Sequence, residues 1–195
     1  MDQNNEWLEL LNKSNKKTVT INKTTEELNE LKANSAYMNA TKVNSNLVPK
    51  DMTNYFERPV LGKILILPKK SAQLFEYDKP WACISVSDSY AYFDADLKNP
   101  HHVLRLRFDD TEFDVDNPTN RPISLEQVKQ IEEFAADVWN KVDLMMIHCN
   151  AGWSRSPAIG RMLSLKYQPE FEKYFDLLYS PNVLVVKRFN EMRNP

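Results

Sequence analysis

The segment from His148 to Ser156, HCNAGWSRS, holds one of the chain's two cysteines and one of its three glycines. A cysteine in its thiolate form is a nucleophile, and an arginine guanidinium can bind two oxygens of a phosphate through its planar fork. Cys149 and Arg155 lie six positions apart, with Gly152 between them. This combination indicates either a phosphate site built around a nucleophilic thiolate or an ordinary turn that happens to contain these residues.

The sequence on either side of this loop is typical of a buried strand and a helix. The continuous apolar run DLMMIHC, residues 143–149, is the pattern of a strand buried on both faces. A helical pattern begins near SPAIGRMLSLKY, residues 156–167, and Pro157 fits its first turn because no N–H is needed there. In an open α/β sheet, such a loop presents free amides and the positive end of the helix dipole to an anion. This position favours the phosphate site over the turn.

Each residue of the loop has a role in such a site. Cys149 would be the nucleophile, because a helix N-terminus and a nearby cation favour the thiolate. Arg155 would hold the phosphoryl oxygens and stabilise charge in the transition state, and Gly152 permits the positive φ that a curled loop requires. Ser156 is placed to donate its hydroxyl to the sulfur and so assist its departure from a phospho-cysteine. The phosphate-binding amides would belong to Asn150, Ala151, Gly152, Trp153, Ser154 and Arg155.

Three upstream segments rich in β-branched and apolar residues predict strands. These are VLGKILILP at residues 60–68, WACISVSD at 81–88 and HHVLRLRFDD at 101–110. Further helices are predicted at PEFEKYFDLLY, residues 169–179, and at NVLVVKRFNEM, residues 182–192. The second of these helices is expected to bury Val183, Val186 and either Phe189 or Asn190.

The segment SLEQVKQIEEFAADVWNKV, residues 124–142, predicts a helix that starts after Ser124. Ser124 and Gln127 form an S-x-x-Q capping box, which satisfies two amides at the helix start. The expected buried face carries Leu125, Val128, Ile131, Phe134 or Ala135, and Val138. Because strands and helices alternate along the chain, the predicted fold class is α/β, with a mostly parallel central sheet flanked by helices.

Composition and charge exclude several classes of partner. The formal net charge of −2 and the absence of a long basic run predict no binding to nucleic acid or to an acidic membrane surface. No apolar stretch approaches the roughly 18–20 residues of a membrane span, and the first residues lack a signal-peptide layout, so we expect a cytoplasmic protein. Two cysteines without a CxxC pair predict neither a disulfide framework nor a metal site.

The Cys-x5-Arg motif, preceded by His and followed by Ser within MMIHCNAGWSRSPAIG, resembles the signature loop of the cysteine-dependent protein tyrosine and dual-specificity phosphatases. Together with ISVSD, VLRLRFDD, the capped helix and SPNVLVV, it resembles the small tyrosine-phosphatase-like proteins of bacteria and their phages over about residues 60–190. The resemblance implies a catalytic domain over residues 59–195 that needs no metal and no cofactor. Residues 1–58 are predicted to form a polar, partly helical N-terminal extension, a candidate docking segment for a protein partner.

The family also uses an aspartate general acid on a loop that follows a strand, upstream of the helix that leads to the catalytic strand. RFDDTEF, residues 107–113, stands in this place. Asp110 is the predicted acid and Asp109 the alternative, because Asp110 lies further from the strand end. Asp114 and Asp116 are less suitable, since DVDNPTN is typical of a turn-rich loop.

Three other residues carry open alternatives. His148 is expected to orient the loop through hydrogen bonds rather than to transfer a proton. Trp153 either packs or stacks on an aromatic substrate at the mouth of the pocket. Cys83 is expected to be a small buried core residue, with a resolving thiol for oxidised Cys149 as the alternative.

The predicted function is hydrolysis of phosphomonoesters through a phospho-cysteine intermediate. The loop NAGWS is uncharged before its closing Arg155, which favours phosphotyrosine in proteins, alone or with phosphoserine and phosphothreonine, over polyanionic substrates. Two alternatives remain at this point. One is a catalytically silent module that binds phosphorylated residues, and the other is a phosphatase for a nucleotide, an RNA end or an inositol phosphate.

Overall fold

The computed structural model describes residues 58, 60–115 and 120–194. Its five strands are β1 (Val60–Leu61), β2 (Ile64–Pro68), β3 (Trp81–Ser87), β4 (His102–Arg107) and β5 (Leu144–Cys149). They form one sheet in the order β1-β2-β5-β3-β4, in which only the β1–β2 pair is antiparallel. The predicted α/β fold with a mostly parallel sheet is therefore confirmed. The partly helical extension predicted near the N-terminus lies outside the described residues, except for Arg58.

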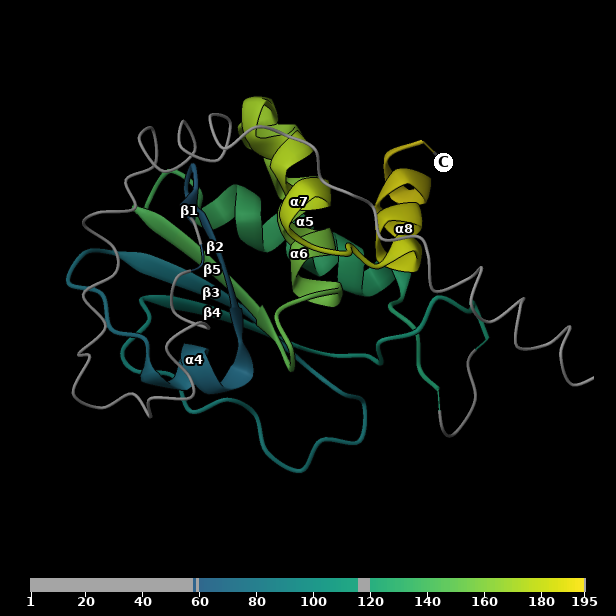
Figure 1. The fold of residues 1–195 in the computed structure, drawn as a ribbon, viewed down its shortest axis with the longest axis horizontal. Coiled ribbons are helices and arrows are strands. Elements are labelled where there is room, and N and C mark those ends of the chain that lie inside the picture. Colours follow the sequence, from purple (N-terminus) through teal and green to yellow (C-terminus); the bar gives the residue numbers. More distant parts are fainter. Residues whose placement is uncertain (1–57, 59, 116–119, 195) are drawn as a thin grey trace, which may run out of the picture. The chain divides into compact units, whose positions relative to one another are not determined.

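Helices cover both faces of this sheet (Figure 1). The described helices are α4 (Lys69–Leu74), α5 (Leu125–Val138), α6 (Arg155–Tyr167), the 3-10 helix η3 (Pro169–Phe171), α7 (Glu172–Leu178) and α8 (Val183–Arg193). Helix α4 lies on one face, and α5 and α6 pack on the other, with α7 and α8 beyond them (Figure 1). Strand β5 lies between β2 and β3 and is buried at all six positions, as its apolar run predicts. The strand that carries Cys149 is thus held at the centre of the sheet.

The first predicted strand, residues 60–68, is two strands joined by a tight turn. Gly62 has a φ of +61°, and a Cβ there would lie 2.2 Å from the side-chain oxygen of Gln168. Gln168 holds the turn by donating to the Leu61 carbonyl and accepting from the Lys63 amide. The sequence analysis assigned the whole segment to one strand and did not predict this reversal, although Gly62 and Lys63 interrupt the apolar residues at the turn.

The predicted capping box at the start of α5 is confirmed. The Ser124 hydroxyl accepts from the Gln127 amide, and the Gln127 side chain accepts from the Ser124 amide. Val128, Ile131, Ala135 and Val138 are buried as expected, but Leu125 is exposed, so its predicted burial was wrong. Leu125 is the first helical residue and lies at the rim of the helix packing.

The buried face of α8 differs from the predicted one. Leu184, Val185 and Phe189 are buried, whereas Val183 is exposed and Val186 is only partly covered. Asn182 caps the helix and fixes the start of its first turn, which turns Val183 outward. Helix α4 was not predicted, because its six residues are too few to show a periodic pattern. None of the described helices is both long and apolar enough to cross a membrane.

Candidate active site

The loop from Cys149 to Arg155 joins the carboxyl end of β5 to the first turn of α6, as the sequence predicts. Gly152 adopts a φ of +63°, and a Cβ at this position would lie 2.6 Å from the backbone carbon of Leu67 and from the nitrogen of Pro68. Any larger residue would therefore be strained and would collide with the end of β2. The loop needs glycine here for both its conformation and its close packing.

The carbonyl groups of the loop are bound by the elements that surround it. Four of these carbonyl oxygens accept a hydrogen bond. Asn150 O accepts from Lys69 N (3.2 Å), Gly152 O from Arg58 Nη1 (3.4 Å), Trp153 O from Ser180 N (3.2 Å) and Ser154 O from Asn182 N (3.1 Å). Within the part of the chain that the structure describes, the amides of Ala151, Trp153 and Ser154 donate to no protein acceptor. Successive free amides of this kind form a concave site for an anion.

The Cys149 sulfur is buried at the base of this loop and accepts two hydrogen bonds. The Ser156 hydroxyl lies 3.2 Å from Sγ, and the Gly152 amide lies 3.3 Å from it. Both donors are directed at the atom that would take up negative charge when a bond to sulfur breaks. The structure therefore brings together Cys149 and Ser156 in the geometry expected for a nucleophile and the hydroxyl that assists its departure.

Arg155 is anchored through one nitrogen, and its other nitrogens form no hydrogen bond with the described residues. Its Nη1 donates to the Phe108 carbonyl at 2.7 Å and lies 2.8 Å from the Asp88 carboxylate. Its Nε is buried and has no hydrogen-bond partner among the described residues. The edge formed by Nε and Nη2 remains available to bind two oxygens of one phosphoryl group.

Asp88 belongs to this site, although the sequence analysis assigned it no role. Besides its contact with Arg155, it accepts a hydrogen bond of 2.5 Å from the Asn150 side chain. One carboxylate thus binds both ends of the loop. The available signal was its position directly after the buried strand β3, at the edge of the sheet where ligands bind in α/β folds.

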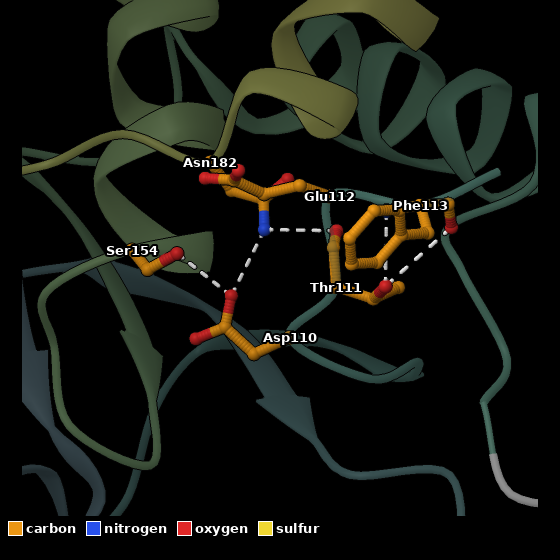
Figure 2. Close-up of a pocket in the computed structure, with 6 residues that line it drawn as sticks. All are labelled: Asp110, Thr111, Glu112, Phe113, Ser154 and Asn182. Atoms are coloured by element: carbon orange, nitrogen blue, oxygen red, sulfur yellow. Dashed lines mark hydrogen bonds between the residues drawn. The ribbon is translucent and has the colours of Figure 1, made fainter. Parts of the chain in front are cut away.

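Asp110 points toward the loop, and its carboxylate is held by two side chains (Figure 2). Its Oδ1 accepts from the Ser154 hydroxyl at 2.7 Å and from the Asn182 amide at 2.9 Å. Its Oδ2 takes part in neither bond and lies 3.7 Å from Arg155 Nε. Oδ2 is therefore the oxygen of Asp110 without a hydrogen bond, and it faces Arg155.

Asp109 has different surroundings from its neighbour. Its carboxylate accepts from the Ser89 amide (3.0 Å), the Ser89 hydroxyl (2.7 Å) and the Arg121 amide (2.8 Å). Partial burial opposes ionisation, but these hydrogen bonds outweigh it and hold the pKa of Asp109 below its usual range. Asp109 is thus an ionised residue that ties two loops together. Asp114 is paired with Arg188 on α8, and Asp116 lies outside the described residues.

Asn182 is a second residue that the sequence analysis did not assign. Its side-chain oxygen accepts from the amides of Leu184 and Val185 and caps α8, while its side-chain nitrogen donates to Asp110 and to the Thr111 carbonyl. An asparagine before a helical pattern does predict a cap. Its contact with Asp110 could not be predicted, because the two residues are 72 positions apart.

The structure does not support the hydrogen-bonding role predicted for His148. Its ring is fully buried, and neither ring nitrogen has a hydrogen-bond partner among the described residues. Side chains alternate along a strand, so the ring lies on the face of the sheet opposite to Cys149. Burial lowers the pKa of His148 to about 4 against an opposing effect of the Cys149 backbone, and nearby Lys69 and Arg105 lower it further, so the ring is neutral at pH 7.

Cys83 has the first of the roles considered for it, whereas Trp153 makes a packing contact and also leaves part of its ring exposed. Cys83 is a fully buried core residue whose pKa is raised by desolvation. Cys83 pairs with Met146 on β5, three residues before Cys149. The two cysteines are therefore on the order of 10 Å apart along the strands and on opposite faces of the sheet, which is too far for a disulfide.

The Trp153 ring packs edge-on against Tyr179, and Arg58 lies 5.7 Å from its centre. About half of Trp153 remains exposed beside the loop.

Comparison with solved structures identifies the fold. The chain is similar to the human tyrosine phosphatase-like serine/threonine/tyrosine-interacting protein, with a TM-score of 0.50 at 16% identity over 70% of this chain and 94% of that chain. The described chain has a tyrosine-phosphatase-like fold. The predicted resemblance is confirmed at this level.

Two further solved structures are similar with lower TM-scores. A variant of human DUSP28 gives 0.49 at 14% identity over 69% of this chain and 92% of that chain. Tk-PTP in the active form gives 0.44 at 15% identity over 66% of this chain and 88% of that chain. No family model and no curated protein matches the sequence.

Proposed function

We propose that this protein is a cysteine-dependent phosphatase that hydrolyses phosphomonoesters through a phospho-cysteine intermediate. The observation that carries the proposal is the convergence of three groups on one loop. The Cys149 sulfur lies below the loop, the free edge of Arg155 closes it, and Asp110 Oδ2 lies 3.7 Å from that edge. Nucleophile, phosphate ligand and acid are thus arranged around a single tetrahedral group.

In the first step, the Cys149 thiolate attacks phosphorus, a sulfur–phosphorus bond forms, and the bond from phosphorus to the ester oxygen breaks. Arg155 and the loop amides bind the equatorial phosphoryl oxygens, where charge is spread in the transition state. Asp110 gives its proton to the leaving oxygen. Because Oδ1 is occupied by Ser154 and Asn182, the proton comes from Oδ2.

In the second step, water attacks the phospho-cysteine and the ionised Asp110 accepts its proton. A phosphorus–oxygen bond forms, the sulfur–phosphorus bond breaks, and the electron pair returns to Cys149. The Ser156 hydroxyl, 3.2 Å from the sulfur, stabilises the departing thiolate. Inorganic phosphate leaves and the free enzyme is restored.

Phosphotyrosine in proteins is the proposed substrate, with phosphoserine and phosphothreonine as further substrates. The loop carries no basic side chain before Arg155, so it offers no extra cations for a polyphosphorylated lipid or a nucleic acid. The partly exposed ring of Trp153 offers a face for an aromatic leaving group. We further propose that the protein acts in the cytoplasm, and that residues 1–58 form an extension which docks a protein partner.

A phosphate-release assay with wild type and Cys149→Ser tests this proposal. The substrates are a generic aryl phosphate, phosphotyrosine and phosphothreonine peptides, a nucleotide and an inositol phosphate. We expect release from the aryl phosphate and the phosphotyrosine peptide by wild type and none by the variant. Full activity of Cys149→Ser would refute the nucleophile, and preferred release from the nucleotide or inositol phosphate would refute the substrate class.

One observation favours a second candidate, a noncatalytic module that binds phosphorylated residues. The human protein with a TM-score of 0.50 is described as tyrosine phosphatase-like and as an interacting protein. The same anion site could bind a phosphorylated side chain without turnover. Tight binding of a phosphopeptide by wild type with no release of phosphate would support this candidate.

A further inference from the structure

A cavity of about 400 Å³ opens beside Asp110, and three of its lining residues, Thr111, Glu112 and Phe113, have no role in the proposed reaction. It is lined by Asp110, Thr111, Glu112, Phe113, Ser154 and Asn182 (Figure 2). Ser154 belongs to the phosphate loop, so a group in the cavity lies next to the phosphorylated residue. We propose that this cavity binds a basic side chain, arginine or lysine, that flanks the phosphorylated residue of the substrate. The inference rests on the proposed function for the class of substrate.

The charges around the cavity favour a cation. Glu112 is exposed and forms no ion pair with any residue that the structure describes, whereas its neighbour Asp114 is paired with Arg188. None of the six lining residues is basic, and Asp110 adds no free negative charge, because it lies 3.7 Å from Arg155 Nε and carries the proton of the proposed general acid when substrate binds. A substrate cation would therefore meet the negative charge of Glu112, while an acidic side chain would be repelled by it.

The aromatic ring of Phe113 provides the second contact that a basic side chain requires. It is 77% exposed and stands in the wall of the cavity next to Glu112 (Figure 2). A guanidinium or ammonium group stacked on an aromatic face gains a cation–π interaction, and its carbon stem covers apolar surface. A purely apolar side chain would contact Phe113 but would also remove water from Glu112 without replacing its hydrogen bonds.

The wall of the cavity is held in place before any substrate binds. The Thr111 hydroxyl accepts from the Phe113 amide at 3.1 Å, and the Thr111 carbonyl accepts from Asn182 at 3.1 Å (Figure 2). The ion pair between Asp114 and Arg188 fastens the next residue to α8. A preformed wall lowers the entropic cost of binding, so the cavity is suited to recognition.

The test compares phosphotyrosine peptides in which both residues flanking the phosphotyrosine are arginine, alanine or glutamate. We expect wild type to show a kcat/KM about tenfold higher for the arginine peptide than for the alanine peptide, mainly through KM, and lowest for the glutamate peptide. The same order is expected for binding of labelled peptides to Cys149→Ser, which does not depend on turnover. Added salt should reduce the preference.

Variants locate the effect in the cavity. Glu112→Gln and Phe113→Ala should each reduce the preference for arginine, and Glu112→Lys should reverse it toward glutamate, with turnover of a small aryl phosphate unchanged. Glu170→Gln is the matched control, because Glu170 is also exposed but lies away from the cavity. It is two positions from Gln168, which binds Leu61 and Lys63 at the edge of the sheet opposite to β4.

The two proposals fail in different ways. Equal binding of the three peptides by Cys149→Ser, or a preference that persists in Glu112→Gln and Phe113→Ala, would overturn the basic subsite. Absence of aryl phosphate turnover in wild type would instead refute the proposed phosphatase activity. A preference for arginine in binding would then still support the cavity as a site for a basic side chain.

Discussion

Two neighbouring aspartates at the end of β4 show how residues of one type differ through their partners. Asp109 accepts three hydrogen bonds from Ser89 and Arg121, so its oxygens are fully engaged in holding two loops. Asp110 receives two bonds on one oxygen and leaves the other facing the phosphate loop. A general acid needs an oxygen that is free to exchange a proton with the substrate, and only Asp110 of this pair has one.

Asp110→Asn should therefore lower kcat for an aryl phosphate by about 10²–10⁴-fold. Asp109→Asn should keep most of the activity and should lower the free energy of unfolding by about 1 kcal/mol, because a structural hydrogen bond is lost. Both kinetics and urea denaturation should be measured on the two variants. The reverse pattern, a large rate loss in Asp109→Asn alone, would move the acid to Asp109.

At the level of elements, Asn182 connects the N-terminus of α8 to the segment that contains Asp110 and Thr111. This one side chain caps the helix and also binds Asp110 and Thr111. The end of β3 acts in a similar way, since Asp88 binds both Asn150 and Arg155. The site thus depends on where α8 and β3 end as much as on the loop itself.

Asn182→Ser separates the two functions of this residue. Serine is a good helix cap, so the free energy of unfolding should stay within about 1 kcal/mol of the wild-type value. The hydroxyl is too short to bind Asp110 as well, and the loss of one positioning hydrogen bond should lower kcat/KM by about tenfold. Asn194→Ser, at the other end of α8, is the control. Unchanged kcat/KM in Asn182→Ser would show that the contact does not position the acid.

The capping box of α5 affects stability alone. Ser124→Ala removes the acceptor for the Gln127 amide and should lower the free energy of unfolding by about 1 kcal/mol, which corresponds to a fall in Tm of about 2–4 °C. Turnover of an aryl phosphate at a temperature well below Tm should not change. A Tm equal to that of the wild type would show that the box contributes nothing measurable.

For the whole molecule, local sequence signals predicted the strand–loop–helix unit around Cys149 and the start of α5. Each of these depends on residues close together in the sequence, namely an apolar run, a capping box and the Cys-x5-Arg spacing. The contacts that complete the site join residues far apart, such as Asn150 with Asp88 at 62 positions and Asn182 with Asp110 at 72. No periodicity in one sequence reports such contacts, because they arise from the order in which strands and helices pack.

Folding of the whole chain should depend on pH through His148. The folded state lowers the pKa of this ring from 6.5 to about 4 by burial. Between these values the unfolded chain binds a proton that the folded protein does not bind, so stability falls as pH decreases from 6.5 toward 4, by up to about 3 kcal/mol. Urea denaturation of wild type and His148→Gln at pH 7 and pH 4 measures this difference. Equal losses in both proteins would contradict it.

The central claim, a phosphoryl group carried by the Cys149 sulfur, is tested most directly by intact-mass analysis of acid-quenched enzyme during turnover. Ser156→Ala is the suitable protein, because without the hydroxyl at 3.2 Å the thiolate leaves more slowly and the intermediate accumulates. With an aryl phosphate as substrate, we predict a phosphoryl adduct that peptide mapping places on Cys149 and that is absent when Cys149→Ser is added to the variant. Phosphate release that continues in Cys149→Ser, or an adduct on another residue, would contradict the account.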